Sequence, residues 1–198
     1  MGAASVSGIV EDIGWLVCGV DATIPLFWFM VHPFADYWRK RHRPMLPYMG
    51  LYWIVLWVLA WMVSAPWRHV RLYQAHWTWL LTALLWAVSI FLYAAGGLSL
   101  TLRRIIGRPE LNSGDAGNQL VSTGIHGHVR HPIYLGHFLA MLGWSVGTGS
   151  LACWALTAFA VATGAVMISM EERELEQRFG QQYREYKQRV PKLVPRWK

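Results

Sequence analysis

Cysteine is scarce in this 198-residue chain, and its two cysteines lie inside apolar runs with unrelated neighbours. Cys18 and Cys153 therefore predict neither a disulfide framework nor the paired spacing of a metal-binding motif. The sequence also lacks internal repeats and low-complexity segments. The segment before the first apolar run contains no lysine or arginine, and no small-residue cleavage pattern is present. That run is therefore expected to be a retained helix rather than a signal peptide.

The composition is dominated by apolar residues. Hydrophobic residues make up 55% of the sequence, and 13 residues are tryptophan, whose amphipathic indole ring favours membrane–water interfaces. Several apolar runs approach the ~20 residues that a helix needs to cross a bilayer. The sequence therefore predicts an all-α integral membrane protein with about five transmembrane helices and a C-terminal cytoplasmic helix. The five runs cover residues 13–34, 47–65, 77–100, 133–146 and 151–170.

The segments between these runs differ in their content of basic residues. If successive segments alternate between the two sides, one side holds four, four and eight Lys or Arg residues, and the other holds two. The positive-inside rule then predicts an extracytoplasmic N-terminus and a cytoplasmic C-terminus, in a bacterial or archaeal inner membrane. The net charge of +7 follows from this topology and favours contact with anionic membrane lipids. Because the basic residues are dispersed along membrane flanks, no nucleic-acid partner is expected.

A single domain over residues 1–198 is expected, in two parts. Residues 1–100 form a three-helix membrane part, and residues 101–198 form a part with a short helical hairpin and a tail. In the hairpin, Gly143 and Gly147 lie four residues apart, a spacing that lets helices approach closely in lipid. Asp21 lies inside the first run, where a carboxylate costs about 2.5–3.5 kcal/mol on insertion scales, so it is expected to face the bundle or water.

The tail after residue 170 has an amphipathic pattern. Leu175, Phe179, Tyr183 and Tyr186 fall on one stripe of a helix, and four glutamates cluster in its first turns. These carboxylates suit a helix that begins near residue 170, but the fifth transmembrane helix can equally continue into the tail without a break. Glu174 is predicted to lie on the solvated face of this helix.

The stretch GIHGHVRHPIYLGHF holds four of the chain's eight histidines. His126, His128 and His131 have the spacing H-x-H-x-x-H, which differs from the i, i+4 pairs of helical zinc sites. Pro132 disfavours helical backbone at His131 and separates it from His137. No metal site is therefore expected here.

The same stretch suits a different kind of ligand. Pro132 favours the first turn of a helix, where its missing amide proton is not needed. Backbone donors at such a helix start favour an anionic group, and Tyr134, one turn further, can add a hydroxyl. Glu171 is expected at the same height on the next helix, where it offers a counter-charge to an ammonium group. A carboxylate site beside an ammonium site matches the amino-acid end of S-adenosylmethionine.

Two segments, LVSTGIHGHVRHPIYLGHF and EERELEQRFGQQYREYKQRVPKLVP, closely resemble the isoprenylcysteine carboxyl methyltransferase family. That family belongs to a wider group of membrane methyltransferases that includes phospholipid N-methyltransferases. The resemblance covers roughly residues 118–195 and rests on an RHPxY segment, a short hairpin, an acidic pair, then FG, two tyrosines and VP. It implies transfer of a methyl group from S-adenosylmethionine to a lipophilic acceptor drawn from the bilayer.

The resemblance also implies which positions hold the cofactor. The glutamate that holds the cofactor in this family falls on Glu171, with Glu172 as its neighbour. His126 takes a position that is usually aromatic and can retain both stacking and hydrogen bonding. The full implied set of cofactor-binding residues is Asn118, Gln119, Leu120, Val121, His126, Arg130, His131, Pro132, Tyr134, Glu171 and Glu172.

The position implied to bind the acceptor departs from the family. Isoprenylcysteine enzymes carry an arginine there for the substrate carboxylate, whereas this chain has Met167. A carboxylate acceptor needs no base, but an amine or thiol acceptor must lose a proton, and His126 or His128 is the expected catalytic base. The acceptor is left open between a prenylcysteine, a phospholipid and a small amine or thiol.

Two further interpretations stay open at this point. Sterol reductases share a related RHP-containing C-terminal region, but they use a reduced nicotinamide and need more transmembrane helices. A membrane scaffold without catalytic activity requires the same helices but no functional cofactor site. Binding of S-adenosylmethionine distinguishes a methyltransferase from both.

Overall fold

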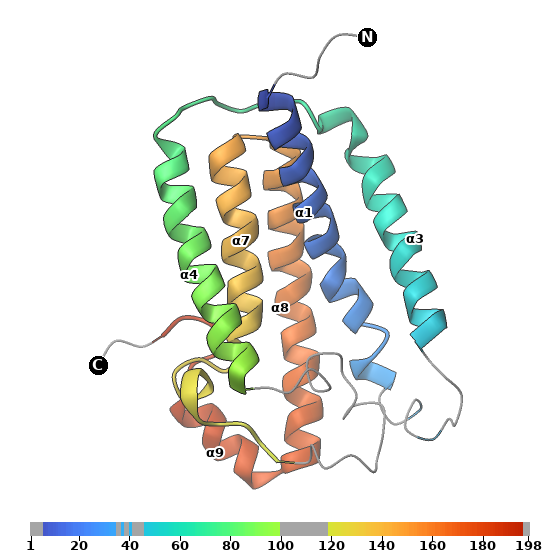
Figure 1. The fold of residues 1–198 in the computed structure, drawn as a ribbon. Helices are drawn as coiled ribbons and strands as arrows, with labels where there is room; N and C mark the ends of the chain where they lie inside the picture. Colours follow the sequence, from blue (N-terminus) through green and yellow to red (C-terminus); the bar gives the residue numbers. More distant parts are fainter. Residues whose placement is uncertain (1–5, 35–36, 38–39, 41–45, 100–118, 196–198) are drawn as a thin grey trace.

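The computed structural model describes residues 6–34, 37, 40, 46–99 and 119–195. Five long helices in this part of the chain lie roughly along one axis, and a shorter helix crosses one end of the bundle (Figure 1). Short 3-10 helices occur at His32–Phe34 (η1), Ala65–Trp67 (η2) and Gly124–Gly127 (η3). The α-helices are α1 (Val6–Trp28), α3 (Leu46–Ser64), α4 (Thr78–Ser99), α7 (Pro132–Thr148), α8 (Leu151–Phe179) and α9 (Gln181–Arg189).

Helices long and apolar enough to cross a membrane confirm the predicted fold class. Four such segments cover Gly8–Phe34, Tyr48–Trp67, Thr78–Gly97 and Leu151–Phe179. Many large apolar side chains on α3 and α4 point outward, as lipid-facing side chains do; Leu80, for example, is 78% exposed. The fifth long helix, α7, has 17 residues and runs along the same axis, so the expected total of five membrane crossings stays a prediction.

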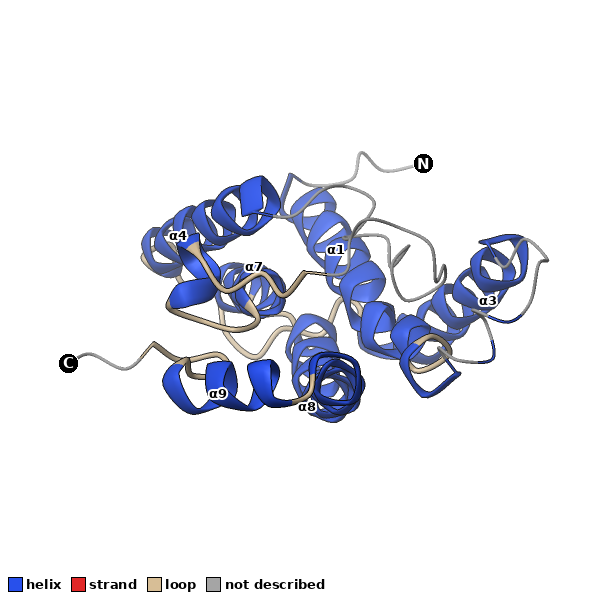
Figure 2. Ribbon diagram, turned by 90° about the horizontal axis from the view of Figure 1, so that it is seen from below, coloured by secondary structure: helices blue, strands red, loops and turns tan. Residues whose placement is uncertain are grey.

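The hairpin formed by α7 and α8 lies at the centre of the bundle. α7 packs against α4, α1 and α8, while α3 packs mainly on α1 at the outer edge (Figure 2). A buried core joins α1, α7 and α8, and both cysteines belong to it as free thiols. Its members are Trp15, Cys18, Ala22, Met141, Ala152, Cys153 and Ala160.

Small residues on α7 allow α4 to approach closely, as the spacing of Gly143 and Gly147 predicted. A Cβ atom added at Gly143 would lie 2.6 Å from Trp86 Nε1, and one added at Gly147 would lie 2.8 Å from Thr82 Oγ1. At this distance α4 side chains reach the α7 backbone: Thr82 Oγ1 donates to the Gly143 carbonyl over 2.9 Å. Such bonds satisfy hydroxyl groups that lipid cannot.

The turn between α7 and α8 is held in place by hydrogen bonds to the loop that precedes α4. Gly149 has a φ of +63° and ends α7 in the left-handed conformation. Its carbonyl accepts a hydrogen bond from Leu72 N–H over 2.8 Å, and Leu151 N–H donates to the Val70 carbonyl over 2.8 Å. Arg71 in the same loop is ion-paired with Glu11 of α1, which is 4% exposed. This end of the bundle is therefore cross-linked between helices.

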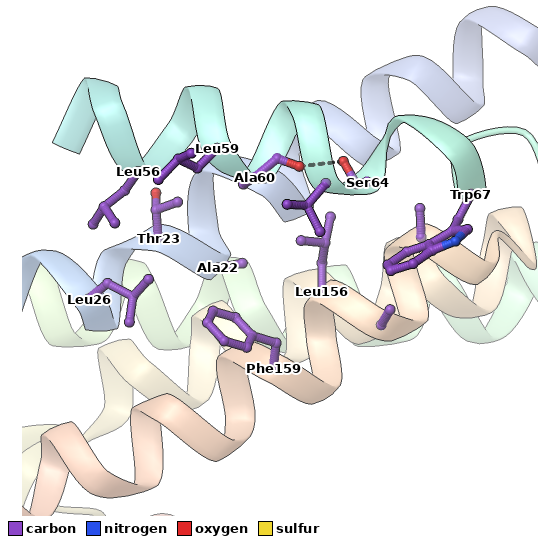
Figure 3. A pocket seen from close by; sticks show the side chains of 13 residues that line it. Ala22, Thr23, Leu26, Leu56, Leu59, Ala60, Ser64, Trp67, Leu156 and Phe159 are labelled. Atoms are coloured by element: carbon purple, nitrogen blue, oxygen red, sulfur yellow. Dashed lines mark hydrogen bonds between the residues drawn. The ribbon is translucent and has the colours of Figure 1, made fainter.

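An apolar cavity of about 350 Å³ lies between α1, α3 and α8 (Figure 3). Leu26, Leu59 and Phe159 are among the side chains that line it. Its few hydroxyl groups are already bonded within the protein: Thr23 accepts from Trp53 Nε1 over 2.8 Å. The cavity wall thus suits a hydrocarbon chain.

The close contact at Gly143 makes a prediction about stability. Gly143→Ala is expected to destabilise the protein by about 1–3 kcal/mol, because Trp86 must move and its bond to the Ala140 carbonyl is lost. Gly19→Ala is the matched control, since an added Cβ meets no atom within 4 Å. It is expected to be neutral or to stabilise α1 by about 0.5–1 kcal/mol. Thermal unfolding in detergent measures both, and equal stability of the two variants would contradict the packing described.

Candidate functional site

The residues predicted to bind a cofactor gather at the end of the bundle where α7 begins and α8 ends. The 3-10 helix η3, the first turn of α7, the last turns of α8 and the short helix α9 all lie at this end (Figure 1). As predicted, α7 begins at Pro132, and the non-helical His131 precedes it with a φ of −123° and a ψ of 63°. The loop that carries His126, His128 and His131 therefore lies next to the start of α7.

The carboxylate of Glu172 organises this end of the molecule. Glu172 is 3% exposed, and its Oε1 accepts hydrogen bonds from Arg130 Nε (2.9 Å) and Nη2 (2.7 Å). His131 Nε2 lies 3.1 Å from the same oxygen, and Lys192 Nζ lies 3.4 Å from Oε2. A buried carboxylate with this set of donors is stable only while they stay in place. Glu172 thereby joins α8 to the loop before α7 and to the tail.

The tail after α9 folds back along that loop. Arg130 N–H donates to the Pro191 carbonyl over 2.9 Å, and Arg130 Nη1 donates to the Lys187 carbonyl over 3.0 Å. The Tyr186 hydroxyl donates to the His126 carbonyl over 2.7 Å. Burial raises the pKa of Tyr186 to about 12, so this phenol keeps its proton and remains a donor. The tail therefore holds the loop in one conformation.

Several buried polar atoms beside this network have no hydrogen-bond partner within the described part of the chain. They are Glu171 Oε2, His126 Nδ1 and Tyr183 OH. Glu171 Oε2 lies 3.9 Å from His131 Nδ1, which is too long for a hydrogen bond. Buried polar groups are rarely left unpaired, because the loss of water costs free energy. Their grouping at one place indicates a site for a polar ligand.

His126 is neutral at pH 7. Burial and the neighbouring His131 together lower its pKa to about 4, although Glu171 acts in the opposite direction. A neutral imidazole can both donate and accept a hydrogen bond. His126 is therefore suited to a neutral polar group of a ligand. His128 in the same loop is exposed.

The remaining predicted residues lie around this centre. Tyr134 stacks on His131 with ring centroids 5.7 Å apart, and Met167 is buried one turn before Glu171 on α8. Gln119 is exposed and Val121 is half-buried, whereas Asn118 lies outside the described residues. Among the residues that the structure describes, no three His, Cys, Asp or Glu side chains are grouped as metal ligands.

The apolar stripe of the tail is confirmed as a packing surface. Tyr183, Tyr186 and Val190 form a buried cluster, against which Leu175, Phe179 and the predicted cofactor residue Leu120 pack. The stripe is divided between two helices, because α8 continues unbroken from the membrane part to Phe179 and Gly180 then ends it with a φ of +54°. This decides between the two alternatives that the sequence left open.

The prediction for Glu174 is wrong. Its side chain is buried, with 8% of the residue exposed, and does not lie on a solvated face. Residues three apart lie on nearly the same side of a helix, so Glu174 shares the side of Glu171 that faces the site. Two residues of the site were not predicted as such: Tyr183 and Lys192. Both occur in the tail motif that carried the family resemblance, which was the available signal.

Comparison with known proteins relates this part of the chain to membrane methyltransferases. Residues 92–182 match the family described as phospholipid methyltransferase. The protein-S-isoprenylcysteine O-methyltransferase B of Arabidopsis thaliana is 42% identical over 83 residues, which are 39% of this chain and 40% of that relative. Methanethiol S-methyltransferase 1 of Bradyrhizobium diazoefficiens is 47% identical over 68 residues, or 34% of this chain and 23% of that relative.

A third relative belongs to a different enzyme class. A Delta(14)-sterol reductase of Mus musculus is 33% identical over 82 residues, which are 40% of this chain and 20% of that relative. No solved structure matches the chain. Each match thus covers less than half of the relative's length. The predicted resemblance is confirmed: the C-terminal part of this chain is similar to phospholipid methyltransferases and to isoprenylcysteine O-methyltransferases.

The Glu172 network makes the second prediction. Glu172→Gln is expected to destabilise the protein by about 3–5 kcal/mol, because Arg130 and His131 are left without their buried carboxylate. Glu185→Gln is the matched control, since Glu185 is exposed and bonds Gln181 at the surface. Thermal unfolding and amide hydrogen exchange of α9 measure the effect. If both variants unfold at the same temperature, Glu172 does not anchor the tail.

Proposed function

We propose that this chain is an integral membrane methyltransferase that transfers a methyl group from S-adenosylmethionine to a lipophilic acceptor taken from the bilayer. The observation that carries the proposal is a group of buried polar atoms on Glu171, His126 and Tyr183, near the start of α7, that have no hydrogen-bond partner among the described residues. Relatives named as O- and S-methyltransferases support the same reaction class. Contacts of α1 with α7 and α8 support a single domain over residues 1–198.

The unpaired groups suit the polar parts of S-adenosylmethionine. Glu171 is assigned to its ammonium group, since a buried carboxylate oxygen without a hydrogen bond gains a charge-assisted one there. The N-terminal end of α7, whose helix dipole favours an anion, is assigned to its carboxylate. His126, which is neutral, is assigned to an uncharged polar group of the cofactor. The residues present therefore fit this cofactor.

Arg130 and Glu172 have a different role in this proposal. Each is occupied by the other and by neighbouring groups, so neither offers a free charge to a ligand. They act as positioning residues that hold His131 and the loop before α7. We therefore propose that Arg130 and Glu172 contribute to cofactor binding only indirectly.

Methyl transfer from a sulfonium ion needs alignment and exclusion of water more than acid–base chemistry. The bound cofactor supplies the electrophilic methyl group. The protein positions it where α7 begins and α8 ends, near the buried Met167, which offers the acceptor only apolar contact. The apolar cavity between α1, α3 and α8 is lined by the first turns of α8, up to Phe159, so it offers room for the far end of a long hydrocarbon chain of the acceptor (Figure 3).

We also propose that the site end of the bundle faces the cytoplasm, with the N-terminus on the other side. α1 and α4 begin at the opposite end from the site, and α9 lies at the site end (Figure 1). The excess of Lys and Arg on the segments at the site end supports this orientation. A periplasmic reporter fused before residue 1 is expected to be active, and one fused after residue 198 inactive. The reverse pattern would contradict the orientation.

The role of Glu171 is the direct test of the proposed function. Glu171→Gln is expected to weaken S-adenosylmethionine binding by about 1.5–3 kcal/mol, the cost of losing a hydrogen bond to a charged group. Glu185→Gln serves as the exposed control, in place of the buried Glu174. Calorimetry on detergent-solubilised protein measures both. If the wild type binds no S-adenosylmethionine, the methyltransferase proposal fails, and binding of a reduced nicotinamide in its place would favour the reductase class.

A further inference from the structure

A second group of polar side chains meets inside the helical bundle. Asp21 of α1, Tyr93 of α4 and His137 of α7 converge there from three helices. The Tyr93 hydroxyl lies 2.6 Å from His137 Nδ1, and Asp21 Oδ1 lies 3.4 Å from the same nitrogen. The Tyr93 and His137 rings meet edge to face, with centroids 5.0 Å apart and planes at 85°. The expectation that Asp21 faces the bundle is thus confirmed.

This group lies deeper in the bundle than the cofactor site but on the same helix. His137 follows His131 by six residues, which is about 9 Å along α7 at the helical rise. The side chains of Asp21 and His137 are 15% and 23% exposed, so the group is largely enclosed but still accessible. An acceptor that approaches the cofactor from the membrane is therefore brought close to His137.

Polar side chains of this kind are costly within a membrane bundle, and a merely structural role would require only that they satisfy one another. Here the contacts with Tyr93 and with Asp21 are both made by His137 Nδ1. No hydrogen bond to its other nitrogen, Nε2, occurs among the described residues. A carboxylate beside Nδ1 orients an imidazole and stabilises its protonated form, which leaves Nε2 able to take a proton.

We propose that His137 is the proton acceptor of this enzyme, and that the methyl acceptor is a neutral thiol on a lipophilic body. Asp21 and Tyr93 are positioning residues for His137. The inference rests on the proposed methyltransferase function and names the acceptor class for it. It assigns to His137 the role that the sequence suggested for His126 or His128.

The thiol, His137 and the methyl donor account for every proton and electron pair in the step. The S–H bond of the thiol breaks and its proton moves to His137 Nε2. The sulfur electron pair forms the new S–CH₃ bond, while the bond from the methyl carbon to the sulfonium sulfur breaks and leaves a neutral thioether. The Asp21 carboxylate balances the positive charge that arises on the imidazole.

The charges around the site favour a thiol over other acceptors. A thiol enters the bilayer uncharged and loses its proton only on attack. A carboxylate is already ionised and needs a cation, but Arg130 is bound to Glu172 and the acceptor position is the apolar Met167. An amine carries a positive charge at neutral pH, which is costly to bring into the bundle.

Among the residues that the structure describes, few titratable groups lie near His137. α1 contributes Asp21, with the buried thiol of Cys18 one turn before it, and α4 contributes Tyr93. On α8, which packs against α7, no titratable residue occurs between Cys153 and Glu171. Effects of substituting Asp21 on the reaction are therefore attributed to its contact with His137.

The experiment compares methylation of two thiols by purified protein. Octanethiol is protonated at neutral pH and needs a base, whereas para-nitrothiophenol is already ionised and needs none. His137→Gln is expected to lower octanethiol methylation by about 10²–10⁴-fold, the usual contribution of a general base, with para-nitrothiophenol changed by less than about tenfold. His76→Gln, in the exposed loop at the opposite end, is the control and is expected to leave both rates unchanged.

A second measurement does not depend on activity. NMR of ¹⁵N-histidine-labelled protein is expected to show that Asp21→Asn shifts the His137 ring away from the tautomer protonated at Nδ1, which the Asp21 carboxylate favours. Equal losses for both thiols, or no loss with octanethiol, would overturn the proposal. Methylation of neither thiol by a wild type that binds S-adenosylmethionine would overturn it as well, while leaving the methyltransferase function in place. Absence of S-adenosylmethionine binding would instead remove the function itself.

Discussion

The buried carboxylate of Glu172 connects three segments that are far apart in the sequence. From the end of α8 it binds Arg130 and His131 before α7 and Lys192 after α9. Taking an ionised group out of water costs several kcal/mol, and only a complete set of donors offsets this cost. The loop that carries His126 is therefore positioned by the tail, and the candidate cofactor site requires both α8 and the residues that follow α9.

The membrane interior imposes the same requirement on the rest of the bundle. Hydroxyl groups of α4 donate to backbone carbonyls of α7, which is possible because glycines bring the two helices together. Asp21, Tyr93 and His137 contact one another across three helices. These contacts link α1, outside the region that matches known methyltransferases, to the helix that begins at the candidate cofactor site.

Local signals predicted the elements that depend on local physics. Pro132 starts α7, since its ring suits the first helical turn, and the Gly143–Gly147 spacing marks the close approach of α4. The prediction failed at Glu174, whose burial depends on which side of α8 faces the site. The pattern of charges around residue 174 is equally compatible with a solvated helix, so the sequence alone could not show that this side is covered.

The integral membrane fold class and the resemblance to membrane methyltransferases were predictable from the sequence, because long apolar runs and the RHPxY and acidic-pair motifs do not depend on long-range contacts. The same motifs also predicted at which end of the helices the candidate cofactor residues gather. The different roles of the charged residues became visible only in the folded chain: Glu172 is bound by Arg130, His131 and Lys192, while Glu171 has a buried oxygen with no hydrogen bond from any residue that the structure describes. Two adjacent glutamates look alike in a sequence, and they differ here because successive residues of a helix point about 100° apart and so meet different neighbours.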